Sequence, residues 1–164
     1  MDLFAAAEWL ETTAAAVMVR ESAWGFPILV AIHLLGLTIS AGVVIWFDLR
    51  LLGVSMRGQP VSQVYRRLMP LAFAGFAVMF VSGGFLLAGF ATDAYSNLYF
   101  RIKTAALVLA GINAFIYHRL TERTIAGWDT APRPPLAARM AGLISLAVWV
   151  VVVLAGRMMS YTMF

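Results

Sequence analysis

The stretch "AIHLLGLTISAGVVIWFDLR", residues 31–50, decides the fold class of this chain. It belongs to a run from Glu21 to Asp48 in which His33 is the only side chain that can carry a charge near neutral pH. This run exceeds the roughly 20 residues that a helix needs to cross about 30 Å of hydrocarbon. The sequence therefore predicts a transmembrane helix over residues 24–47, with a histidine inside it.

The composition of the whole chain favours the same environment. Of its 164 residues, 62% are hydrophobic and 12% are charged, and the mean hydropathy is +0.87. A soluble domain of this size cannot bury so much apolar side chain. The absence of cysteine excludes disulfides, thiolate metal sites and a cysteine nucleophile. We expect the lipid bilayer as the main partner, and no nucleic acid.

Further apolar runs predict three more spans, near residues 69–91, 98–118 and 139–162. The alanine-rich start of the chain, residues 2–20, predicts an additional helix that lies along the membrane interface. The expected fold is all-α: an integral membrane four-helix bundle that forms a single domain over residues 1–164.

The basic residues predict the orientation of the bundle. Two of the predicted loops are rich in arginine: Arg50, Arg57, Arg66 and Arg67 in the first, and Arg119, Arg123, Arg133 and Arg139 in the third. Residues 92–98 carry no basic side chain. Because basic loops stay in the cytoplasm, we expect both termini outside and a multi-pass protein of a bacterial inner (plasma) membrane. Asp48 and Arg50, near Arg66 and Arg67, predict a structural ion-pair cluster at the inner end of the first span.

Three polar groups are predicted at similar depth in the outer half of the bundle. By helical rise, His33 lies about 14 Å along the first span and Lys103 about 8 Å along the third. Arg157 lies near the outer end of the fourth span. Such groups are costly in hydrocarbon and usually face the bundle interior. His33 is therefore either a metal ligand or a structural histidine that bonds a hydroxyl, such as that of Thr38 or Ser40.

Several short segments carry a resemblance to known membrane proteins. "WLE" (9–11), "RESAWGFP" (20–27), "HLLG" (33–36) and "DLRLLG" (48–53) resemble a family of short four-span bacterial membrane proteins with no established activity. More distantly, residues 33–53 and 100–120 resemble the haem-containing four-helix protoporphyrinogen oxidase and the copper-resistance membrane domain. In that oxidase a first-helix histidine ligates haem and a third-helix lysine is functionally important.

The resemblance to the oxidase implies a haem b pocket near the outer face. His33 would be an axial ligand, and Lys103 with Arg157 would neutralise the propionates or hold an anionic substrate. The expected function is electron transfer, or a haem-linked oxidation by an oxidoreductase with an unknown redox partner. His118 lies about 23 Å along its span from Lys103, so it cannot share one iron with His33.

Two other functions remain open. Thioethers suit Cu(I), and Met158, Met159 and Met163 near the end of the chain could handle copper together with His33. Alternatively, the chain is a cofactor-free accessory subunit of a membrane complex, whose polar groups bind a partner, a lipid headgroup or a quinone. A homo-oligomer or a larger membrane complex is the expected assembly.

Overall fold

The structure, a computed structural model, describes residues 2–163 apart from the side chains of residues 120–122. The elements in this range are helical, without a strand. In chain order they are α1 (Leu3–Glu11), α2 (Ala14–Glu21), α3 (Gly25–Leu51), α4 (Val61–Gly89), α5 (Ala91–Ser96), α6 (Leu98–Ile116), a π-helical turn η1 (Tyr117–Thr121), a 3₁₀ helix η2 (Glu122–Gly127) and α7 (Leu136–Met163).

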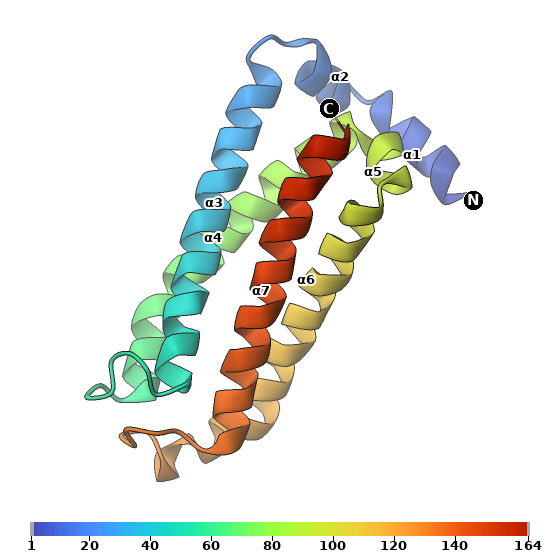
Figure 1. The fold of residues 1–164 in the computed structure, drawn as a ribbon. Coiled ribbons are helices and arrows are strands. Elements are labelled where there is room, and N and C mark those ends of the chain that lie inside the picture. Colours follow the sequence, from blue (N-terminus) through green and yellow to red (C-terminus); the bar gives the residue numbers. More distant parts are fainter. Residues whose placement is uncertain (1, 164) are drawn as a thin grey trace.

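The four long helices form a bundle in which α3 packs on α4, α6 packs on α7, and α3 also contacts α7. The short helices α1, α2 and α5 lie together at one end, beside the last turn of α7 (Figure 1). We call this the terminal end. The opposite end, which carries the connections α3–α4 and α6–α7, is the loop end (Figure 1).

Four helices in the described part of the chain are long and apolar enough to cross a membrane. They are Gly25–Leu51, Val61–Gly89, Leu98–Arg119 and Leu136–Met163, which confirms the predicted all-helical fold and its four spans. Large apolar side chains stay exposed on their outer faces: Leu35, for example, is 63% exposed and Phe80 is 62% exposed. Such a surface suits lipid and would be a liability in water. The chain is therefore a multi-pass membrane protein.

Helix α4 begins at Val61, well before the predicted start at residue 69. Arg66 and Arg67, which precede the predicted span, belong to the helix, because a helix can continue beyond the edge of the apolar run. Its first turn is fixed by Asp129, whose carboxylate accepts hydrogen bonds from the backbone N–H and the hydroxyl of Ser62, both at 2.7 Å. Pro70 lies inside α4 without ending it, as membrane helices tolerate.

The N-terminal segment is two helices, where the sequence predicted one helix over residues 2–20. The break falls at two adjacent threonines. Thr12 donates its hydroxyl to the carbonyl of Trp9, and Thr13 caps α2 by accepting from the N–H of Ala16. Threonine side chains compete for backbone groups in this way and favour helix ends. Helix α2 packs on the bundle, because Val19 is fully buried against Gly89 of α4.

A carboxylate ties α1 to the connection between α4 and α6. Oε1 of Glu11 accepts hydrogen bonds from the N–H of Thr92 at 2.8 Å and from its hydroxyl at 2.7 Å, and Oε2 pairs with Arg20 at 3.1 Å. Burial alone would raise the pKa of Glu11, but the Thr92 hydrogen bonds and the charge of Arg20 outweigh it and hold the pKa below 4.5. The ionised form is therefore the one that docks α1.

We expect Glu11→Ala to weaken the docking of α1 by about 2 kcal/mol, because two hydrogen bonds to a charged group are lost. Hydrogen exchange of the α1 and α5 amides measures the change. Glu8→Ala on the same exposed helix is the matched control and should leave protection unchanged. Because docking lowers the pKa of Glu11, the carboxylate stabilises the docked state fully only at a pH above its undocked pKa. Protection should therefore fall as the pH drops through the lowered pKa of Glu11. Equal protection in both variants would contradict this role.

Helices α3 and α4 approach closely at two glycines near the middle of the bundle. A Cβ atom on Gly36 would lie 2.9 Å from the backbone N of Met79, and one on Gly75 would lie 2.7 Å from the backbone N of Ser40. Small residues permit such backbone contact between membrane helices. As a result, the backbone of α4 near Met79 is within reach of short side chains on α3.

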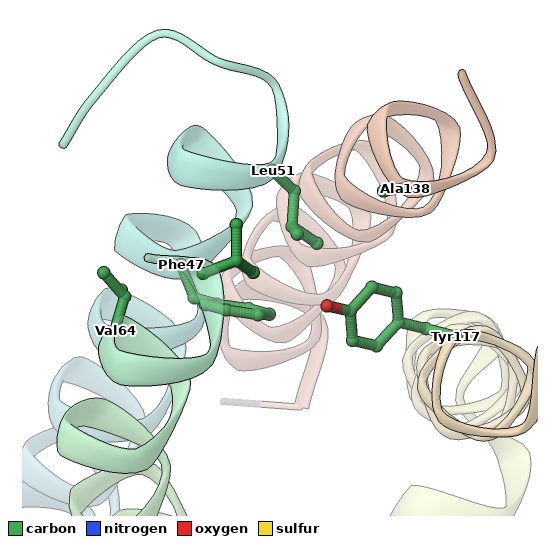
Figure 2. Close-up of a cluster of buried hydrophobic side chains, with 6 residues drawn as sticks. Phe47, Leu51, Val64, Tyr117 and Ala138 are labelled. Atoms are coloured by element: carbon green, nitrogen blue, oxygen red, sulfur yellow. The ribbon is translucent and has the colours of Figure 1, made fainter. Parts of the chain in front are cut away.

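A hydrophobic core closes the loop end of the bundle. Phe47 and Leu51 on α3, Val64 on α4, Tyr117 on η1 and Ala138 on α7 are buried in one cluster, and the Phe47 and Tyr117 rings point toward one another (Figure 2). The centroids of these two rings are 6.0 Å apart in an edge-to-face arrangement. The core therefore ties the π-helical turn to the α3–α4 pair.

The predicted ion-pair cluster at the loop end is wrong in its chemistry. The ion pair that the described residues form is Glu11–Arg20, so neither Asp48 nor Arg50 takes part in one. Arg50 is fully buried and donates to three backbone carbonyls: Gln59 at 2.9 Å, Ala131 at 3.2 Å and Asp129 at 3.4 Å. It fixes the geometry of both loops, as expected of the cluster, but through their backbones.

Candidate functional site

In the part of the chain that the structure describes, the four long helices line a cavity in each half of the bundle. The terminal cavity has a volume of about 330 Å³, and the loop cavity has a volume of about 280 Å³. Both are within or close to the roughly 300–1,000 Å³ range of small-molecule and cofactor sites. The terminal cavity contains the three polar residues singled out in the sequence: His33, Lys103 and Arg157.

His33 is half-buried on α3, and its ring is held by α4. Its Nδ1 lies 3.0 Å from the carbonyl oxygen of Met79 and 3.1 Å from Oγ of Ser82. The Ser82 hydroxyl donates to the carbonyl of Val78 at 2.6 Å. Because the Met79 carbonyl can only accept, Nδ1 carries the proton and Nε2 keeps its lone pair. The hydroxyl neighbour is thus Ser82, while Thr38 and Ser40 donate to carbonyls of their own helix.

A glycine on α4 makes room for the imidazole. A Cβ atom on Gly83 would lie 3.0 Å from Cε1 of His33 and 3.3 Å from its Nδ1. The next residue, Gly84, has open space at the corresponding position. Gly83 therefore allows the ring to approach the backbone of α4, within reach of the Met79 carbonyl.

Two cations share the cavity with His33. Lys103 on α6 lies against Gly156 of α7, where a Cβ atom would be 3.9 Å from its Nζ, and its ammonium has no hydrogen-bond or ion-pair partner among residues 2–163. Arg157 on α7 donates to the hydroxyl of Tyr161 at 2.9 Å and lies over its ring at 4.6 Å. A guanidinium has five N–H donors, so most remain for an anion.

The methionines at the end of α7 divide between cavity and surface. Met159 and Met163 line the terminal cavity, whereas Met158 is 41% exposed and does not. Within the described residues no three His, Cys, Asp or Glu side chains are grouped as a metal site. Any metal in this cavity would therefore be held by His33 together with thioethers, or together with ligands that the protein does not supply.

His118 belongs to the other cavity. It lies at the loop end on η1, where its Nε2 is 3.1 Å from the hydroxyl of Tyr65. The two histidines thus line separate cavities, as the sequence predicted from helical rise. The loop cavity also contains Asp48, which is 4% exposed and lies beside Ser145.

An apolar layer separates the two cavities. The rings of Phe76 on α4 and Trp149 on α7 stack with their centroids 5.7 Å apart. Trp149 also packs with Ala41, Ala106 and Val152 in a buried cluster. No described residue lines both cavities, so the polar groups of the two halves lie in separate cavities.

Sequence reasoning missed the groups that orient His33. The main partner is the backbone carbonyl of Met79, which any residue type could supply, so no side-chain pattern marks it. "SGG" at residues 82–84 was the available signal: its serine and first glycine both contact the imidazole. The true neighbour of the Asp48 carboxyl, Ser145 on α7, was also missed, because an arginine two residues away suggested a pair.

Comparison with known proteins gives a family but no activity. No curated protein and no solved structure matches the chain significantly. One family model matches residues 7–162, described as a family of unknown function, DUF6644. This match covers nearly the whole bundle and includes all three polar residues of the terminal cavity. The chain therefore belongs to the DUF6644 family.

Proposed function

We propose that this protein holds a haem b in the terminal cavity, with Nε2 of His33 as an axial ligand to the iron. The orientation of His33 carries the proposal. Histidines that ligate metals almost always donate their other ring N–H to a carbonyl or carboxylate, and Nδ1 of His33 is held by the Met79 carbonyl at 3.0 Å. Nε2 is thereby left as the free nitrogen of a ring that lines the cavity.

The remaining lining residues fit a flat, dianionic group. Gly83 provides a surface without a side chain beside the imidazole. Lys103 and Arg157 bring two positive charges to the same cavity, where charge-assisted hydrogen bonds to carboxylates are strong. The rest of the lining is largely apolar, as haem requires. Haem b in such a site supplies one-electron redox chemistry. The protein would act in electron transfer or a haem-linked oxidation near the outer face.

Copper handling is the second candidate, because Met159 and Met163 line the cavity that holds His33. One imidazole and two thioethers form a ligand set suited to Cu(I). A copper site would leave Lys103 and Arg157 without a role. Their positive charges would also disfavour the binding of Cu(I) nearby. We therefore rank it below haem.

The visible spectrum of the purified protein tests the proposal. We expect a Soret band with α and β bands that sharpen on reduction, when the chain is expressed with haem supply and isolated in mild detergent. Copper by elemental analysis without a chromophore would favour the second candidate. Neither haem nor copper would refute both and favour a cofactor-free accessory subunit.

Two adjacent glycines give a matched pair for the geometry of the site. Gly83→Val places a branched side chain where the His33 ring lies. It should reduce haem affinity by about 10-fold or more, the loss typical when the groups that orient a metal ligand are disturbed. Gly84→Val adds the same bulk on the same helix, where space is open, and should bind haem as the wild type does. Equal haem content in both variants would contradict the proposed position of the imidazole.

A further inference from the structure

The loop cavity combines a buried unpaired carboxyl oxygen with aromatic walls. Asp48 is 4% exposed, and its Oδ2 atom is buried without a hydrogen-bond partner in the part of the chain that the structure describes. An unsatisfied carboxyl oxygen in a membrane protein interior is costly. Native buried polar groups are nearly always paired. The cavity therefore lacks a donor that a ligand could supply.

The Ser145 hydroxyl lies beside the Asp48 carboxyl, yet Oδ2 of that carboxyl is without a partner among the described residues. Tyr65 and His118 bond to each other across 3.1 Å, and the side-chain amide of Asn113 donates to the backbone of Ala141 at 2.9 Å. The Asp48 oxygen is therefore the acceptor toward which a bound molecule would be oriented.

The walls of the loop cavity select the shape of that molecule. Five of its lining residues are phenylalanine or tryptophan: Phe47, Phe73, Phe76, Phe80 and Trp149. The Phe47 and Tyr117 rings, which point toward one another in Figure 2, line it near the loop end, and the stacked rings of Phe76 and Trp149 line it nearer the terminal cavity. An aromatic ring packs well between such faces.

The cavity opens sideways, between α4 and α6. Phe73 and Phe80 on α4 line it although they are 59% and 62% exposed. The facing wall on α6 includes three small residues, Ala110, Gly111 and Ala114, together with Leu107 and Asn113. Because these positions lie within the membrane-spanning helices, a molecule enters from the hydrocarbon of the bilayer and not from water.

We propose that the loop cavity binds a neutral, lipid-soluble aromatic ring with a hydroxyl group, a hydroquinone, whose hydroxyl donates a hydrogen bond to Oδ2 of Asp48. The ring lies among the aromatic walls, and its apolar tail extends between α4 and α6 into the bilayer. This site is separate from the terminal cavity, and it does not depend on whether haem or copper binds there.

Binding of decylhydroquinone to the full chain in lipid nanodiscs tests the site, with tryptophan fluorescence as the readout and empty nanodiscs as the blank for partition into lipid. We expect saturable quenching. Decylhydroquinone dimethyl ether, which keeps the ring and tail but lacks the hydroxyl donor, should bind about tenfold more weakly, because it leaves the buried acceptor unsatisfied. Equal binding of the ether or of the oxidised decylquinone would overturn the proposal, as would the absence of saturable binding.

Two kinds of variant locate the site. Asp48→Leu should weaken decylhydroquinone binding by about tenfold or more while thermal stability is kept, because the change removes an unpaired buried carboxyl. Gly111→Leu keeps Asp48 and fills the cavity from α6, where a Cβ atom meets open space, and should abolish binding. Gly42→Leu on α3 is the matched control, because that glycine also faces open space but lines neither cavity. Unchanged binding in Gly111→Leu, or equal loss in Gly42→Leu, would refute the assignment.

Discussion

Replacing His33 with alanine is expected to abolish the haem binding proposed for the terminal cavity. The imidazole is the one group in the terminal cavity with a free ring nitrogen and a fixed orientation. Its loss should lower haem affinity by more than about 100-fold, the upper end of the effect of an outer-shell partner alone. The Soret absorbance relative to protein, measured on purified His33→Ala, gives the result directly.

His118→Ala is the matched control for this experiment. It removes the second histidine of the chain, whose Tyr65 contact lies in the loop cavity, and should leave the haem content unchanged. Imidazole added to His33→Ala fits the vacated space and should restore part of the Soret band. Loss of haem in His118→Ala with full retention in His33→Ala would reverse the assignment of the ligand.

Arg50→Met is expected to cause the largest loss of stability. The fully buried guanidinium donates to three carbonyl oxygens from two loops. Methionine keeps much of the volume but donates nothing, so those carbonyls lose their partners. Since hydrogen bonds to a charged group contribute about 1.5–3 kcal/mol each, the free energy of unfolding should fall by more than about 3 kcal/mol. Titration with a denaturing detergent, followed by circular dichroism, measures the change.

The control for Arg50→Met is Arg67→Met. Arg67 is an exposed arginine on α4, near the same end of the bundle, and its substitution should change the free energy of unfolding by less than about 0.5 kcal/mol, as is usual for a surface position. If both variants unfold at the same detergent concentration, Arg50 does not hold the loops. That result would mean that the packing of Phe47 and Tyr117, and not the hydrogen bonds of Arg50, stabilises the loop end.

The fold could be predicted from the sequence because hydrophobic run length controls it. The interval from Glu21 to Asp48 is too long and too apolar for any other structure, and the span appears as α3. Boundaries were less predictable, because charges mark the edge of the hydrocarbon and not the end of a helix. Helix α4 accordingly begins at Val61. The break between α1 and α2 depends on which carbonyls two threonine hydroxyls find, which the local sequence does not determine.

The candidate site was predictable in its members and not in their contacts. Helical rise placed His33, Lys103 and Arg157 at similar depth, and they line one cavity. The rotation of each helix was not available from depth alone. The pairing of Asp48 was mispredicted for a related reason: residues two apart on a helix point in different directions. The partner of His33 is a backbone carbonyl, brought near by the Gly36–Gly75 crossing.

The stacked rings of Phe76 and Trp149 bear on whether protons could cross the membrane through the bundle. A bundle with ionisable groups at two depths would conduct protons if a file of water joined them, and it would dissipate the electrochemical gradient. The aromatic stack, with Val152 and two alanines beside it, offers water few polar partners at that level. A continuous file of water between the ionisable groups of the two cavities would have to cross this apolar layer.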